Sequence, residues 1–103
     1  MVDDDLMGEL LALHELLEDP VRWTTNAPWR DEDGKPTDCR SEVCSACIVG
    51  GASMVTVSAS GDRLVAALSS VSHRWLAGVN DYEGHDSVMA LIRRAIEREA
   101  ERL

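Results

Sequence analysis

Leucines at helical spacing predict the first element of the chain, a helix over residues 4–18. The apolar positions that define its buried face are Leu6, Leu10, Leu13 and Leu17, which are separated by four, three and four residues. This spacing places side chains on one face of an α-helix, because one turn takes about 3.6 residues. The acidic residues 3–5 favour the positive end of the helix dipole, and Pro20 ends the helix.

The next segment, residues 20–41, has no helical pattern and is rich in proline and acidic residues. Asp33-Gly34 is typical of a tight turn, so Trp29-Arg30 and Pro36-Thr37 are expected to form a short hairpin around it. An irregular segment this long in a small domain usually folds back on the core or forms a binding element. We expect Trp23 and Trp29 to pin it to the helices, since an indole buries a large area.

A central helix is expected next. No charged residue occurs between Val43 and Ser60, and the small residues in this stretch favour a helix that begins at Ser41-Glu42. Gly50-Gly51 lowers helix propensity by about 1 kcal/mol per glycine relative to alanine, so close packing by neighbouring elements is the expected reason for both.

Two further helices are expected in the last part of the chain. The third opens at residues 60–62, and its apolar positions are Leu64, Val65, Leu68, Val71, Trp75, Leu76 and Val79. Residues 78–84 interrupt the helical pattern. Asp86 or Ser87 then caps a last helix with an apolar stripe from Val88 to Leu103.

Together these elements predict a mainly α fold. We expect a compact four-helix single domain over residues 1–103, with a long ordered loop or short β-hairpin between helices one and two. The chain has 103 residues, 45% of them hydrophobic, and a chain of this length buries enough surface for one core without disulfides. The acidic start, residues 1–5, lacks the basic region of an export signal, and the uncharged stretch is too polar for a membrane span. A cytoplasmic protein is expected.

The net charge of −9 is unevenly distributed. Residues 1–36 hold ten acidic and three basic residues, whereas residues 37–103 hold nine acidic and seven basic ones. Such a surface repels phosphate, and the arginines near the C-terminus alternate with glutamates, which argues against direct nucleic-acid binding. An acidic face can instead dock on a basic protein surface or imitate nucleic acid.

Three cysteines with no export signal argue against a disulfide framework. The spacing Cys39-x4-Cys44-x2-Cys47 matches the first three ligands of a plant-type [2Fe–2S] loop, but the fourth cysteine is missing. A zinc site with three cysteines and a histidine is the other metal alternative, and its fourth ligand would be His73, His85 or His14. The favoured interpretation needs no cofactor, because Cys44 and Cys47 at positions i and i+3 of a helix would be small buried hydrophobes.

The remaining polar and aromatic residues have simple expected roles. Asn80-Asp81 is expected to satisfy its own backbone in a turn and to pre-cap the last helix. Trp75 is in phase with the core, whereas His73 is expected to face solvent. Trp29, beside Pro28 and an acidic turn, is the best candidate for an exposed interaction anchor. No G-x-S-x-G motif is present, and we expect no enzymatic activity.

The order of these features resembles a family of small uncharacterised proteins from actinobacteria and their phages. The residues that carry the resemblance are Trp23, the turn Asp31-Glu32-Asp33-Gly34-Lys35-Pro36, the segment Cys47-Ile48-Val49-Gly50-Gly51-Ala52, Asn80-Asp81 and Gly84-His85-Asp86-Ser87. It covers residues 6–100 and differs from the usual pattern in having Gly-Gly-Ala for a Gly-Ala step. The resemblance implies a helical fold and a genomic setting, and it implies no activity.

The function expected from the sequence is therefore that of a non-enzymatic interaction protein. It would be a phage accessory protein that binds a host protein through its acidic N-terminal face, with Trp29, Asp31, Asp33 and Trp23 as binding residues. The alternatives are a small zinc protein built on Cys39, Cys44, Cys47 and His73, and an acidic mimic of nucleic acid. The sequence predicts no membrane partner, and an apolar helix face leaves room for a homodimer.

Overall fold

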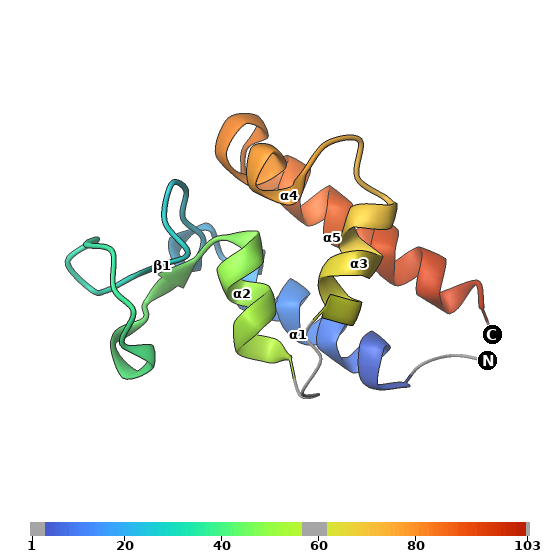
Figure 1. Ribbon diagram of the computed structural model, residues 1–103, viewed down its shortest axis with the longest axis horizontal. Coiled ribbons are helices and arrows are strands. Elements are labelled where there is room, and N and C mark those ends of the chain that lie inside the picture. The colour runs from blue at the N-terminus through green and yellow to red at the C-terminus, as the bar shows by residue number, and fades with distance from the viewer. Residues whose placement is uncertain (1–3, 57–61, 103) are drawn as a thin grey trace.

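Two long helices, α1 (Asp4–Glu18) and α5 (His85–Ala100), pack against each other and form the frame of the molecule. The structure is a computed structural model, and it describes residues 4–56 and 62–102. α1 begins and α5 ends on the same side of the molecule, as Figure 1 shows. The first helix has the bounds that its leucine spacing predicts.

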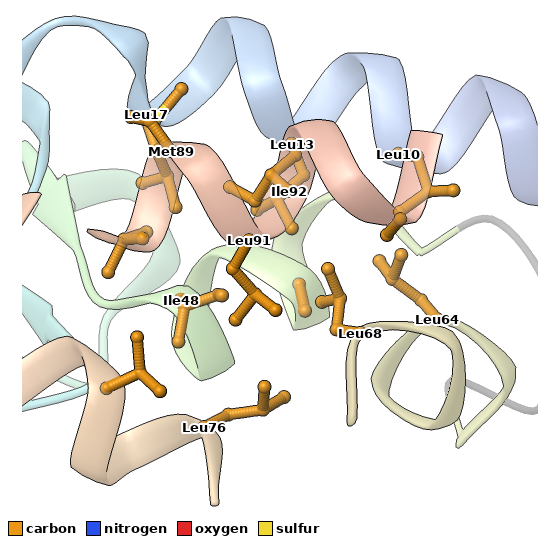
Figure 2. Close-up of a cluster of buried hydrophobic side chains, with 14 of the residues drawn as sticks. Leu10, Leu13, Leu17, Ile48, Leu64, Leu68, Leu76, Met89, Leu91 and Ile92 are labelled. Atoms are coloured by element: carbon orange, nitrogen blue, oxygen red, sulfur yellow. The ribbon is translucent and has the colours of Figure 1, made fainter. Parts of the chain in front are cut away.

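Shorter helices close the core against this frame. They are α2 (Ile48–Val55), α3 (Asp62–Ser70), α4 (Leu76–Gly78) and the π-helix η3 (Val79–Glu83). Figure 2 shows side chains from α1, α2, α3, α4 and α5 meeting in one cluster. Its fully buried members include Leu10, Leu13, Leu17, Ile48, Leu64, Leu68, Leu91 and Ile92. The mainly α fold is as predicted, and transfer of these apolar side chains from water stabilises it.

The third helix is shorter than its pattern predicts. α3 ends at Ser70, and the chain then turns before α4 begins at Leu76. The physical reason is local, because the Ser72 hydroxyl donates to the carbonyl of Arg74 and so competes with the helical backbone. The expected start at residues 60–61 lies outside the described residues. Trp75 consequently falls at the N-cap of α4 and is 69% exposed, so its expected place in the core is wrong.

The central helix starts later than expected, at Ile48 instead of Ser41-Glu42. Residues 40–42 form a short 3-10 helix, η2 (Arg40–Glu42), and the chain then extends into β2 (Ser45–Ala46). β2 pairs antiparallel with β1 (Trp29–Arg30), with Trp29 opposite Ala46 and Arg30 opposite Ser45. This pairing uses backbone groups that a helix would have needed.

The glycine pair in α2 is closely packed, as predicted. A Cβ atom on Gly50 would lie 2.8 Å from the carbonyl carbon of Pro28 and 2.9 Å from the indole nitrogen of Trp29. One on Gly51 would lie 3.1 Å from Cδ1 of Leu13. α2 can therefore approach both the loop and α1 because these two positions carry no side chain.

The predicted hairpin around Asp33-Gly34 is present in part. Arg30 and Pro36 form an antiparallel bridge, and the Thr37 amide donates to the Trp29 carbonyl at 3.1 Å. The regular strand pair, however, joins β1 to β2 instead. A 3-10 turn, η1 (Pro20–Arg22), links α1 to this loop region.

α5 begins directly after Gly84, whose φ of 95° lies in the region that favours glycine. The expected caps, Asp86 and Ser87, lie inside the helix, and no side chain caps its start. The reason is that the π-helix η3 ends at Glu83, so Gly84 is the single residue between η3 and α5. None of the helices in residues 4–56 and 62–102 is both long and apolar enough to cross a membrane.

Candidate functional site

The loop between α1 and α2 carries an open cleft of about 400 Å³ that is lined mainly by acidic side chains. We call it the acidic cleft. Its lining residues are Asp31, Glu32, Asp33, Ser41, Glu42 and Cys44. Four of these six carry carboxylates, so the cleft concentrates negative charge in one concave place.

One side of the acidic cleft is a tight turn held by Asp31. Its Oδ1 accepts hydrogen bonds from the amides of Asp33 at 2.9 Å and Lys35 at 3.0 Å. Gly34 completes the turn with a φ of 78°, as the Asp-Gly pattern predicts. Asp31 therefore shapes the loop, while the side chains of Glu32 and Asp33 are exposed to solvent.

The Arg30 guanidinium also holds this turn in place through three hydrogen bonds. It donates to the Thr24 hydroxyl at 2.8 Å, the Gly34 carbonyl at 2.9 Å and the Thr25 carbonyl at 2.9 Å. A planar guanidinium holds its donors in a rigid fork, so one side chain ties together two parts of the loop. The acidic cleft is thus preformed.

The other side of the acidic cleft is held by short polar contacts. Thr37 donates its hydroxyl to Oε2 of Glu42 at 3.2 Å and accepts from the Cys39 amide at 3.1 Å. The Cys39 thiol lies 3.2 Å from the Ser41 hydroxyl. Glu42 is exposed and keeps its carboxylate at the edge of the cleft.

Of the four binding residues expected from the sequence, the structure places Asp31 and Asp33 together in the acidic cleft. Trp29 is half-buried, and its indole N–H donates to the Gly50 carbonyl at 3.0 Å. Trp23 is half-buried too, and it donates to Oδ1 of Asn80 at 2.7 Å. Both indoles pin the loop to helices, as predicted, and Trp29 is not the exposed anchor that was expected.

Asn80 is the polar residue whose role sequence reasoning missed. It is fully buried, and its Oδ1 also accepts from the Ile48 amide at 2.9 Å. Its Nδ2 donates to the Thr24 carbonyl at 2.9 Å and to Oδ1 of Asp81 at 3.0 Å. Oδ1 of Asp81 in turn accepts from the Asn26 amide at 3.0 Å.

The expected roles of Asn80-Asp81, a self-satisfied turn and a cap of the last helix, are therefore wrong. Most of the partners of the pair lie in the loop that follows η1 and at the start of α2, far away in the sequence. The signal that could have revealed this is helical register, because Asn80 follows Leu76 by four residues and so shares its buried face. A buried amide requires partners, which makes such a position informative.

The cysteines do not form the buried helical pair that was expected. Cys39 and Cys44 are exposed, and Cys47 is the N-cap of α2, where its sulfur accepts from the Gly50 amide at 3.3 Å. The zinc alternative finds no support in the geometry of residues 4–56 and 62–102, where no three His, Cys, Asp or Glu side chains are grouped so as to hold a metal ion. His73 is exposed, as predicted, and contacts Glu83.

The fold and the acidic cleft define a small, mainly α domain with an acidic loop that is held by hydrogen bonds. The chain belongs to a family of unknown function, DUF6197, whose model matches residues 1–98. This confirms the expectation of an uncharacterised family. Comparisons with curated proteins and with solved structures give no match.

Proposed function

We propose that this protein is a non-enzymatic interaction protein that binds a basic segment of another protein in its acidic cleft. The observation that carries the proposal is the grouping of four carboxylates around one preformed concavity. A lysine or arginine entering it would meet several negative charges without having to order the loop first, which lowers the cost of binding.

The net charge of the chain also favours a basic partner, at distances beyond direct contact. The chain carries a net charge of −9, so it attracts a basic surface and accelerates the encounter at low salt. Glu32 and Asp33 are exposed at the turn and are the carboxylates best placed to contact a partner. The resemblance to phage proteins makes a bacterial host protein the expected partner, and the protein would then act as an accessory factor in the host cytoplasm.

A pull-down with matched charge variants tests this proposal. The double variant Glu32→Gln/Asp33→Asn removes two charges from the acidic cleft and leaves the Asp31 turn intact. The control Glu15→Gln/Glu97→Gln removes two exposed charges from α1 and α5. From an actinobacterial lysate, we expect the wild type and the control to retain one partner that the cleft variant loses. Equal recovery by all three proteins would contradict the proposal.

The salt dependence of this partner's binding gives a second measurement. Binding of a basic segment by several carboxylates should weaken several-fold when ionic strength rises from 0.05 to 0.5 M, because added salt screens the exposed charges. The cleft variant should show a shallower dependence than the control. Binding that does not respond to salt would also contradict the proposal.

A further inference from the structure

A second hollow, of about 310 Å³, lies against α5 and is separate in its lining residues from the acidic cleft. We call it the α5 hollow. Val71, Val79 and Ala90 give it apolar lining. Val79 is buried, and Ala90 lies on α5 itself. A ligand here would need an apolar body to cover these side chains.

The polar side chains that α5 contributes to this hollow are Ser87 and Arg94. They are seven residues apart, about two helical turns, with Ala90 between them on the same face. Side chains on a helix lean toward its N-terminus, so Arg94 leans toward the turn that holds Ser87. Within the described residues, neither the Ser87 hydroxyl nor the Arg94 guanidinium has a hydrogen bond or an ion pair.

The π-helix η3 also contributes a carboxylate to the α5 hollow, that of Glu83, and this carboxylate is paired with two other side chains. Oε2 of Glu83 lies 2.7 Å from Nε2 of His73 and 3.4 Å from Nε of Arg74. Arg94 therefore remains the unmatched charge of the hollow. The first turn of α5, which includes Ser87, adds the partial positive charge of its free amide groups.

The backbone beside the hollow is also unusual. Val79 and Glu83 both belong to the π-helix η3, and π-helical turns occur often at functional sites. A hollow of this size corresponds to the small end of the range for ligand pockets.

From these observations we infer that the α5 hollow binds a small organic carboxylate. Its carboxylate group would contact Arg94 and Ser87, and its apolar body would cover Val71, Val79 and Ala90. A monocarboxylate suits the site better than a phosphate, because the net charge of −9 repels a dianion more strongly than a monoanion and one arginine matches a single negative charge. This inference is independent of the proposed protein partner, whose site is the acidic cleft.

Titration of the full ¹⁵N-labelled chain with benzoate tests the inference. We expect saturable shifts of amide resonances at residues 71–73, 79–83 and 87–94, with a Kd on the order of 1 mM for so small a ligand. Benzamide, which has the same ring without the charge, should bind at least fivefold more weakly. Inorganic phosphate should give no saturable shifts at these residues.

Two arginine variants supply the matched control. Arg94→Gln should weaken benzoate binding about tenfold, because it removes a charge-assisted contact. Arg93→Gln makes the same change of charge one residue away, at a side chain that does not line the hollow, and should alter the Kd by less than twofold. Ser87→Ala should weaken binding severalfold. The amide spectra without ligand show whether each variant is folded.

The inference would be overturned by the absence of saturable shifts around the α5 hollow, by an equal effect of Arg93→Gln and Arg94→Gln, or by binding of benzamide as tight as that of benzoate. Binding of phosphate in preference to benzoate at the same residues would replace the carboxylate with a different class of ligand and would also overturn it.

Discussion

Oδ1 of Asn80 accepts a hydrogen bond from the indole N–H of Trp23 at 2.7 Å, although the two residues are 57 positions apart. The same oxygen accepts the Ile48 amide, so one side chain joins the end of η1, the start of α2 and the π-helix η3. A buried amide with its hydrogen bonds satisfied holds these segments in one relative position. Through its hydrogen bond to the Thr24 carbonyl, Asn80 also contacts the loop that carries the acidic cleft.

Replacing Asn80 should therefore destabilise the whole domain. Asn80→Ala leaves the buried Ile48 amide and the partly buried Trp23 indole and Thr24 carbonyl without this partner. An unsatisfied group costs about 1–3 kcal/mol where it is fully buried. We expect the free energy of unfolding, measured with urea, to fall by about 3 kcal/mol or more. Asn26→Gly, which removes an exposed amide and keeps its positive φ accessible, should change it by less than about 1 kcal/mol. Similar losses in both variants would refute the assigned role of Asn80.

Two glycine-to-alanine substitutions should have opposite effects. Gly50→Ala places a methyl group against the backbone of Pro28, which cannot move away easily, and should destabilise the fold by about 2 kcal/mol or more. Gly8 is at an exposed position of α1, and a Cβ atom there would meet no atom within 4 Å. Gly8→Ala should therefore stabilise the fold by about 0.5–1 kcal/mol through helix propensity. The midpoint of urea unfolding measures both. A stabilising Gly50→Ala would mean that α2 does not approach the loop this closely.

The rigidity of the acidic cleft should depend on Arg30. Arg30→Lys keeps the charge but cannot reproduce the three contacts of the guanidinium with Thr24, Thr25 and Gly34. Hydrogen exchange of the Gly34 and Lys35 amides should become at least tenfold faster. Arg22→Lys, at an exposed position on η1, should leave these rates unchanged. Unaltered exchange in Arg30→Lys would show that the Asp31 turn is rigid without it.

The two tryptophans whose positions differ from expectation should respond differently to truncation. Trp29→Ala removes a half-buried indole and its bond to Gly50, and should cost about 3 kcal/mol. Trp75→Ala removes a side chain that is 69% exposed and should cost less than about 1 kcal/mol. Chemical denaturation followed by circular dichroism compares them. Equal costs would indicate that Trp75 packs as its spacing first suggested.

The parts of the fold that the sequence predicts are those with strong local causes. α1 follows from regular leucine spacing and a terminating proline, and the turn at Asp33-Gly34 follows from the conformations that these two residues favour. The break after α3 was missed because the apolar period continues to Val79, whereas the hydroxyl of Ser72 diverts the backbone before then. The later start of α2 depends on a strand pair with β1, which is set by tertiary contacts.

The residues of the candidate site likewise divide into those that the sequence predicts and those that it does not. Asp31 and Asp33 are neighbours in the sequence, so their common place in the acidic cleft could be predicted. The contribution of Ser41, Glu42 and Cys44 could not, because the sequence pattern predicts a helix that begins at Ser41-Glu42 and includes Cys44. The burial of Asn80 could be inferred from its helical register with Leu76, but its hydrogen-bond partners lie up to 57 residues away and no local pattern identifies them.

The hydrogen bonds from Asn80 to Thr24, from Arg30 to Thr24 and from Arg30 to Gly34 also bear on when the acidic cleft takes shape. A chain emerging from the ribosome exposes residues 24–44 well before it contains Asn80, and closing so long a loop has an entropic cost. We therefore expect the cleft to become ordered only after η3 has been synthesised. A nascent chain would then recruit no partner before its core is nearly complete.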